Sequence, residues 1–125
     1  MNILIVSHVA HIRNHLAVYL MLQDAIQDVH AVTSTQDVYA MLDAYSFDLL
    51  IVDLDLPGKT GFALVQHVHD TVMRINLLLL GLYITPNMVA MAEATDGLCV
   101  AKSAGIEPIM TAIHTFMEQQ ETSHE

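Results

Sequence analysis

Two side chains that could do phosphoryl chemistry together stand at the ends of two apolar segments. Asp53 follows the apolar residues 49–52, and Lys102 follows the apolar residues 98–101. A carboxylate at a strand end beside an ammonium group can act as a nucleophile toward an activated phosphoryl donor, provided that a counterion is present. We expect Asp53 and Lys102 to pair, because a neighbouring cation relieves an otherwise unpaired buried charge.

The elements that must position these residues follow from the hydrophobic period, which changes repeatedly between short apolar runs and helical stripes. The expected strands cover residues 2–6, 29–33, 49–52, 77–80 and 98–101. The expected helices cover residues 9–25, 36–45, 61–70, 86–93 and 106–118. Regular alternation with short links predicts an α/β fold, a doubly wound parallel sheet with helices on both faces. The functional crevice of such a sheet lies beyond the carboxyl ends of its strands. The residues expected there are Ser7, His8, Asp53, Gly81, Leu82 and Lys102.

The length and charge limit the class of protein. The chain has 125 residues, 54% of them hydrophobic, which is enough for one domain with a substantial core and too few for two. We expect this domain over residues 1–118, with residues 119–125 forming a polar tail or the start of a linker. The formal net charge of -10 disfavours direct contact with nucleic acid, whose affinity depends on Lys and Arg.

Three further features bear on cellular location. The longest apolar run, residues 75–83, is interrupted by polar and small residues and is far shorter than the roughly 20 residues of a membrane-spanning helix. We therefore expect no membrane contact. Residues 1–8 carry no basic segment and no cleavage site of a secretion signal. A lone Cys99 cannot form an internal disulfide, which fits a reducing cytoplasm, and its expected role is core packing.

Residues 48–61, with the sequence DLLIVDLDLPGKTG, resemble the central motif of response-regulator receiver domains, in which an apolar third strand ends in the phosphorylated aspartate. The resemblance spans nearly the whole chain, because five βα units, the lysine that closes the fifth strand and the Pro57-Gly58 turn all fit. It implies a flavodoxin-like fold with strand order 2-1-3-4-5. It also implies that Asp53 is the phosphoacceptor and that Lys102 pairs with it or with its phosphoryl group.

Three positions depart from the pattern of that family. The first strand ends in Ser7 and His8 where the family has two acids that help hold Mg²⁺. Mg²⁺ prefers hard oxygen ligands, so we expect its binding to be weak or lost, with no other cofactor. Gly81 replaces a Ser or Thr whose hydroxyl bonds the phosphoryl group, and Cys99, or Leu98 if the alignment shifts by one residue, replaces an aromatic switch residue. The resemblance therefore implies an atypical receiver or pseudo-receiver. We expect it to act as a regulatory and dimerisation module that is phosphorylation-independent or weakly phosphorylated, in signal transduction or transcription control.

The end of the chain suggests partners. Residues 100–104 and the helix that follows are similar to receivers of transcription factors that carry a C-terminal helix-turn-helix domain. DNA would then be reached only through an attached output domain, and whether one follows Glu125 stays open. We expect a homodimer formed through apolar surface on the fourth helix, fifth strand and fifth helix. Met88 and Met91 on the fourth helix either fill the core or line such a surface.

Several alternatives stay open. A working receiver would be phosphorylated on Asp53 by a histidine kinase. A flavodoxin-like cofactor-binding enzyme needs a phosphate-cradling loop rich in Gly, Ser or Thr, which residues 7–11 lack, so we expect no enzyme. His8, His11 and His15 recur near helical spacing, but no Cys or second acid completes a metal site. A protonated His8 near Asp53 could instead replace part of the missing metal charge.

Overall fold

The structure is a computed structural model that describes residues 1–57 and 60–123. Its strands are β1 (Asn2–Val6), β2 (Asp28–Val32), β3 (Leu49–Asp53), β4 (Asn76–Gly81) and β5 (Leu98–Ala101). Its helices are α1 (Ala10–Met21), α2 (Thr35–Ala44), α3 (Thr60–Thr71), α4 (Pro86–Ala94) and α5 (Ile106–Ser123), with a short 3-10 helix η2 (Lys102–Ala104) before α5. The predicted alternation of strands and helices is therefore confirmed. Within the described ranges, no helix is both long and apolar enough to cross a membrane.

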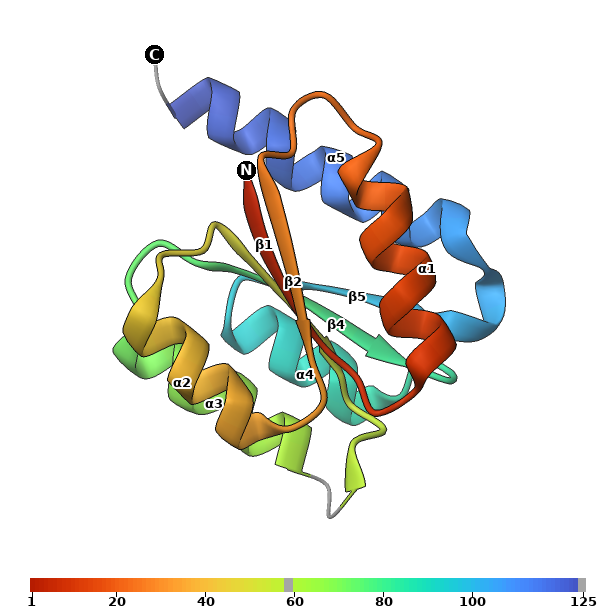
Figure 1. Ribbon diagram of the computed structural model, residues 1–125. Helices are drawn as coiled ribbons and strands as arrows, with labels where there is room; N and C mark the ends of the chain where they lie inside the picture. Colours follow the sequence, from red (N-terminus) through yellow and green to blue (C-terminus); the bar gives the residue numbers. More distant parts are fainter. Residues whose placement is uncertain (58–59, 124–125) are drawn as a thin grey trace.

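All five strands form one parallel sheet in the order β2-β1-β3-β4-β5 (Figure 1). β3 lies at the centre, and all of its residues are buried, because helices cover both faces of the sheet. β1 pairs with β3 in register, from Ile3 opposite Leu49 to Val6 opposite Val52. The flavodoxin-like α/β fold and its strand order 2-1-3-4-5 are thus confirmed. This order sets the carboxyl ends of β1 and β3 side by side, at the point where the winding of the chain reverses.

The helices form two layers around the sheet. Figure 1 shows α1 and α5 on one face and α2, α3 and α4 on the other. Ile5 of β1 packs in the core under α1 and α5, together with Leu20 and Phe116. Its neighbour Leu4 packs in the opposite core, together with Val65 of α3. This division follows from the strand geometry, because successive side chains of a strand point to opposite faces.

α1 ends at Met21, before the residue 25 that the hydrophobic pattern predicts. A tight turn follows it, in which the Ile26 N–H donates to the Gln23 carbonyl at 3.1 Å. The turn brings the Ile26 side chain into the core and lets the Gln27 N–H donate to the Met1 carbonyl at 3.0 Å. The helix therefore ends earlier than its hydrophobic period indicates, because the chain has to turn here to bury Ile26 and to begin β2.

α5 continues to Ser123, whereas the sequence predicts that it ends at residue 118. Glu and Gln are good helix formers, and no Gly or Pro follows Pro108 in the helix to interrupt it. The tail predicted over residues 119–125 is therefore helical as far as Ser123, and its last two residues lie outside the described part of the chain.

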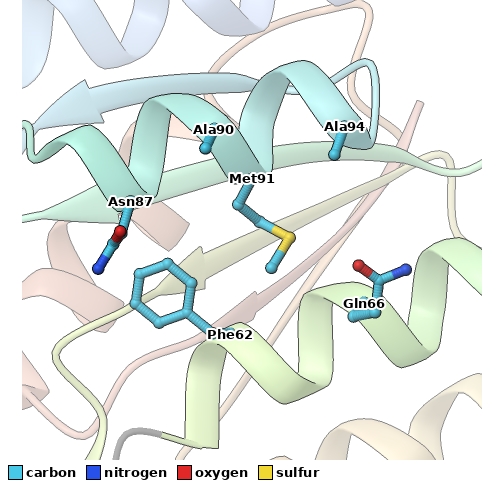
Figure 2. A pocket seen from close by; sticks show the side chains of 6 residues that line it. All are labelled: Phe62, Gln66, Asn87, Ala90, Met91 and Ala94. Carbon is cyan, nitrogen blue, oxygen red and sulfur yellow. The ribbon is translucent and has the colours of Figure 1, made fainter.

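The two methionines of α4 differ in environment. Met88 is buried in the core shared by α2, α3 and α4, so the core-filling interpretation is confirmed for this residue. Met91 is half-buried, and Figure 2 shows it pointing toward Phe62 of α3 in the groove between the two helices. This groove has a volume of about 340 Å³. Met91 therefore packs against the core and also lines the surface groove between α3 and α4.

Candidate functional site

The candidate site lies where the strands end. Ser7 follows β1, Asp53 is the last residue of β3, and Lys102 follows β5 at the start of η2. Parallel strands end at the same edge of the sheet, so these residues meet although they are far apart in the sequence. The structure brings Asp53 and Lys102 together, since Nζ of Lys102 lies 2.8 Å from Oδ1 of Asp53.

The Asp53 carboxylate is buried and has hydrogen-bond donors on both oxygens. Its side chain is 0% exposed. Oδ1 accepts from Lys102 Nζ at 2.8 Å and from the Asp55 backbone N–H at 3.0 Å. Oδ2 accepts from the Ser7 hydroxyl at 2.8 Å. A buried charge is costly unless it is paired and hydrogen-bonded, and Asp53 meets both conditions.

Lys102 bridges two carboxylates. Its Nζ is 2.8 Å from Asp55 Oδ2 as well as from Asp53 Oδ1, and its side chain is only 12% exposed. Burial alone would lower the pKa of Lys102, but hydrogen bonds and charge attraction from Asp53 and Asp55 outweigh it and raise the pKa above the ordinary lysine value. The lysine is therefore firmly charged at neutral pH.

Asp55 is a site residue that sequence reasoning missed. It follows β3 by two residues, and its Oδ2 accepts from the Leu82 N–H at 2.9 Å in addition to the bond from Lys102. The sequence feature that could have revealed it is a second acid two residues after Asp53, in the loop that follows β3. Asp55 therefore connects Leu82, in the loop after β4, with Lys102. The Pro57-Gly58 turn predicted farther along this loop lies partly outside the described residues.

Ser7 and His8 lie in different environments although they are neighbours. Ser7 is buried, and its Oγ both donates to Asp53 and accepts from the Val9 N–H at 3.1 Å. Arg13 of α1, which sequence reasoning also missed, donates from Nη1 to the Ser7 carbonyl at 2.7 Å. His8 is exposed. The proposed coupling of a protonated His8 to Asp53 is not supported, because the His8 side chain is exposed and makes no hydrogen bond or ion pair with the buried Asp53 carboxylate.

Gly81 ends β4, opposite Ala101 of β5. A Cβ atom built on Gly81 would lie 2.6 Å from Sδ of Met88 and 3.1 Å from the Tyr83 carbonyl oxygen. Met88 is held there by α4, whose first turn is capped by Thr85, with Oγ1 accepting from the Met88 N–H at 3.2 Å. Met88 therefore fills the space that a larger side chain at position 81 would need.

Cys99 lies on β5 and packs, half-buried, against the core shared by α2, α3 and α4. Burial raises the pKa of its thiol above the ordinary cysteine value. A raised thiol pKa lowers the fraction of nucleophilic thiolate at neutral pH, so Cys99 resembles a structural cysteine more than a reactive one.

The donor set around Asp53 fits Mg²⁺ poorly. Mg²⁺ needs near-octahedral coordination by hard oxygens, with carboxylates as its protein ligands. Asp53 and Asp55 supply carboxylates, but the Lys102 ammonium already sits 2.8 Å from an oxygen of each. Ser7 replaces what would be a third carboxylate with a hydroxyl that donates to Asp53. Lys102 therefore already supplies a positive charge between the two acids, and these residues offer Mg²⁺ few free carboxylate oxygens.

The histidines of α1 form no larger ligand cluster. The rings of His11 and His15 have centroids 6.0 Å apart. Across residues 1–57 and 60–123, no group of three or more His, Cys, Asp or Glu side chains is arranged to hold a metal ion.

The buried, lysine-paired aspartate thus lies at the strand ends of a flavodoxin-like sheet. The sequence matches the response regulator receiver domain family over residues 3–114, and the chain belongs to this family. It is a receiver domain of two-component signalling, a signalling module and not a classical enzyme. The alternative of a cofactor-binding enzyme is thereby set aside.

Solved structures share this fold at low sequence identity. A DNA-binding response regulator of the LuxR family from Staphylococcus aureus has a TM-score of 0.80 at 17% identity, with 92% of this chain and 97% of that chain covered. The isolated receiver domain of RcsB from Salmonella enterica serovar Typhimurium, with the phosphomimetic BeF₃⁻, has a TM-score of 0.83 at 16% identity, with 94% and 88% covered. The receiver domain of an HD domain-containing protein from Pseudomonas fluorescens has a TM-score of 0.83 at 19% identity, with 98% and 90% covered. A search of curated protein sequences finds no match.

Proposed function

We propose that this receiver domain acts without phosphorylation, as a regulatory and dimerisation module in signal transduction or transcription control. The observation that carries the proposal is the state of the Asp53 carboxylate, which is 0% exposed and accepts hydrogen bonds on both oxygens. A carboxylate nucleophile has to direct a lone pair at the phosphorus of its donor, in line with the leaving group. Because the Asp53 side chain has no exposed surface, a phosphoryl donor could reach either oxygen only after neighbouring groups moved aside.

The surroundings of Asp53 also favour this proposal on charge grounds. A phosphoryl group adds a charge of about -2 at neutral pH. It would join Asp53 next to Asp55, whose carboxylate already shares Lys102. The residues fit Mg²⁺ poorly, and Gly81 offers no hydroxyl to a phosphoryl oxygen. The phosphorylated state therefore has less to stabilise it here than the pattern of the family provides.

The output of this module is proposed to reach DNA only through an attached domain. The net charge of -10 argues against direct DNA contact by these residues. The Staphylococcus aureus protein with the same fold is a DNA-binding regulator, and the solved Salmonella RcsB includes a complex bound to promoter DNA. We propose that the receiver of this chain controls assembly and that a separate domain binds DNA.

A second candidate is a working receiver phosphorylated on Asp53 by a histidine kinase. The observation that favours it is the Asp53–Lys102 pair itself, which is retained at the strand ends with an N–O distance of 2.8 Å. Receiver domains generally interact with histidine kinases. In this case the groups that bury the Asp53 carboxylate would have to move to admit the phosphoryl donor.

The two candidates are separated by exposure to acetyl phosphate, or to BeF₃⁻, with Mg²⁺. Intact mass and amide NMR spectra report the response, and Asp53→Asn is the matched control. We expect no Asp53-dependent change in mass and no shift of the amide signals around Asp53. A phosphoryl adduct or a set of shifts that Asp53→Asn abolishes would overturn the proposal in favour of the working receiver.

A gain-of-function variant checks that the assay can report a positive result. Ser7→Asp combined with His8→Asp restores acids at the end of β1 and removes the hydroxyl that donates to Asp53. We expect this variant to bind Mg²⁺ more tightly than the wild type and to respond to BeF₃⁻. Far-UV circular dichroism of both proteins verifies that the variant is folded.

A further inference from the structure

A groove runs between α1 and the start of α5, which share one face of the sheet (Figure 1). Its volume is about 890 Å³, and sites for small molecules occupy about 300–1,000 Å³. The buried residues Leu16 and Ile109 line it, together with the half-buried Ile12 and Ile106. Leu16 and Ile109 also belong to the core on this face. The groove is therefore a hollow with an apolar lining that reaches the core.

Polar groups meet at the end of this groove that lies beside the strand ends. Lys102, Ser103 and Leu82 all line it, and the Ser103 N–H donates to the Leu82 carbonyl at 3.2 Å. Nζ of Lys102 lies 2.8 Å from one oxygen of Asp53 and from one oxygen of Asp55. A lysine ammonium carries three hydrogens, so one remains for a further acceptor. An apolar hollow with a few polar groups at one end is the usual form of a small-molecule site.

The charges around the groove indicate what kind of molecule it suits. The chain carries 14 acids and a net charge of -10, yet none of the described residues that line the groove is acidic. A cationic ligand therefore meets no carboxylate in the lining. An anionic ligand would approach Lys102, but this one positive charge is already shared by the negative charges of Asp53 and Asp55. The groove therefore favours an uncharged molecule over an ion of either sign.

We propose that the groove between α1 and α5 binds a small, uncharged and largely apolar molecule that carries one hydrogen-bond acceptor. Its apolar part lies against Ile12, Leu16 and Ile109. Its acceptor takes the remaining hydrogen of the Lys102 ammonium or the hydroxyl hydrogen of Ser103. Removal of apolar surface from water supplies most of the affinity, and the polar contact fixes the orientation of the ligand.

The apolar side chains at the end of α1 separate a ligand in the groove from a partner spread over the helix. Val18 is 64% exposed and lines the groove. Leu22 is 74% exposed and is not among the residues that line it. Leu22 follows Val18 by four residues, so both lie on the same side of the helix. A partner that covers α1 would contact both residues, whereas a molecule within the groove depends on Val18 alone.

The surface on which the sequence predicts a dimer contact suits an apolar ligand less well. Among the described residues of α4, β5 and α5, Val89 is the only large apolar side chain that is exposed. The same surface carries the exposed acids Glu93 and Glu107. The expected exposure of apolar surface on these elements is therefore largely wrong, because their apolar side chains are turned into the two cores. Dimerisation itself remains part of the proposed function.

A ligand in the groove contacts residues that hold the site at the strand ends. Lys102 and Leu82 both line the groove. Lys102 holds Asp53, and the Leu82 N–H donates to Asp55. Binding therefore stabilises the arrangement in which Asp53 is engaged, and it gives the domain a signal that needs no phosphoryl transfer. This regulatory role rests on the proposed function, whereas the binding itself does not.

Fluorescence titration with Nile red, an uncharged apolar dye that has a carbonyl group, tests the proposal. Val18→Glu places a charge in the groove, Leu22→Glu changes the neighbouring surface of α1, and Val89→Glu is the matched control on α4. All three positions are exposed, so the substitutions should leave the fold intact, which circular dichroism verifies. We expect saturable binding of one dye per chain, at least tenfold weaker in Val18→Glu and little changed in the other two variants. The anionic dye 1-anilinonaphthalene-8-sulfonate should not displace it.

The other outcomes would each overturn the proposal. A loss of binding in Leu22→Glu as large as that in Val18→Glu would place the dye on the open surface of α1. Absence of saturable binding, or equal affinity in wild type and Val18→Glu, would show that the groove is not a ligand site. Sedimentation velocity at the same concentrations detects a second copy as the occupant, through a dimer that Val18→Glu dissociates. The BeF₃⁻ experiment judges phosphorylation separately, so the failure of one proposal is distinguishable from the failure of the other.

Discussion

Replacing Lys102 by methionine should destabilise the fold by leaving the Asp53 carboxylate buried without its cation. Lys102→Met keeps the length and apolar stem of the side chain and removes the ammonium group that bonds Asp53 Oδ1 and Asp55 Oδ2. Asp55 is exposed and can turn to water. Asp53 has no exposed surface and cannot, so the effect should come from Asp53.

The expected magnitude follows from the distance and the burial. Two unit charges 2.8 Å apart attract by about 6 kcal/mol when the effective dielectric constant is about 20. Desolvation of both groups offsets much of this attraction, and removing one partner of a buried pair costs about 3–5 kcal/mol. Asp53 keeps its hydrogen bonds from Ser7 and from the Asp55 N–H. We therefore expect the lower end, a loss of about 3 kcal/mol in the free energy of unfolding.

Urea unfolding at neutral pH, followed by circular dichroism because the chain has no Trp, measures this loss. Arg74→Gln, which removes an exposed cation, controls for the change in net charge and should cost little. Asp53→Asn combined with Lys102→Met removes both charges and should be more stable than Lys102→Met alone. A cost below about 1 kcal/mol for Lys102→Met is the value of a surface ion pair and would refute our account of a buried, lysine-dependent carboxylate.

Three further predictions concern neighbouring residues. Because Asp53 and Asp55 raise the pKa of Lys102 against the opposing effect of burial, its stabilisation is full below the ordinary lysine pKa of about 10.4 and is lost as the pH rises through the higher folded value. The stabilities of wild type and Lys102→Met should therefore converge in alkaline urea titrations, and a constant difference would contradict this. Gly81→Ser should lower the free energy of unfolding by about 1–2 kcal/mol, because the new side chain clashes with Met88. The loss should be smaller in a Met88→Ala background, and equal losses in the two backgrounds would show that Met88 is not the obstacle. The Cys99 thiol, whose pKa burial raises, should react with a disulfide reagent several-fold more slowly in the folded protein than in urea, and equal rates would contradict its burial.

Much of the fold and part of the site could be predicted from the sequence. The hydrophobic period shows where short apolar runs give way to helical stripes, and this determines the order of strands and helices. It also places Asp53 and Lys102 at the ends of two such runs. Since parallel strands end at one edge, their proximity follows from the fold class alone. That Ser7 and His8 stand where the family has two acids could likewise be read from the sequence.

Only the tertiary structure decided which groups complete the site. The sequence places Ser7 and His8 together at the end of β1, but the backbone there turns one side chain onto Asp53 and the other toward solvent. The part played by Asp55 depends on the path of a loop, and that of Met88 on where α4 packs over β4. These contacts join residues remote in sequence through loop geometry and packing, which local periodicity does not encode. The sequence alone thus determined that Asp53 and Lys102 stand at neighbouring strand ends. Tertiary packing determined that the Asp53 carboxylate is buried and hydrogen-bonded on both oxygens.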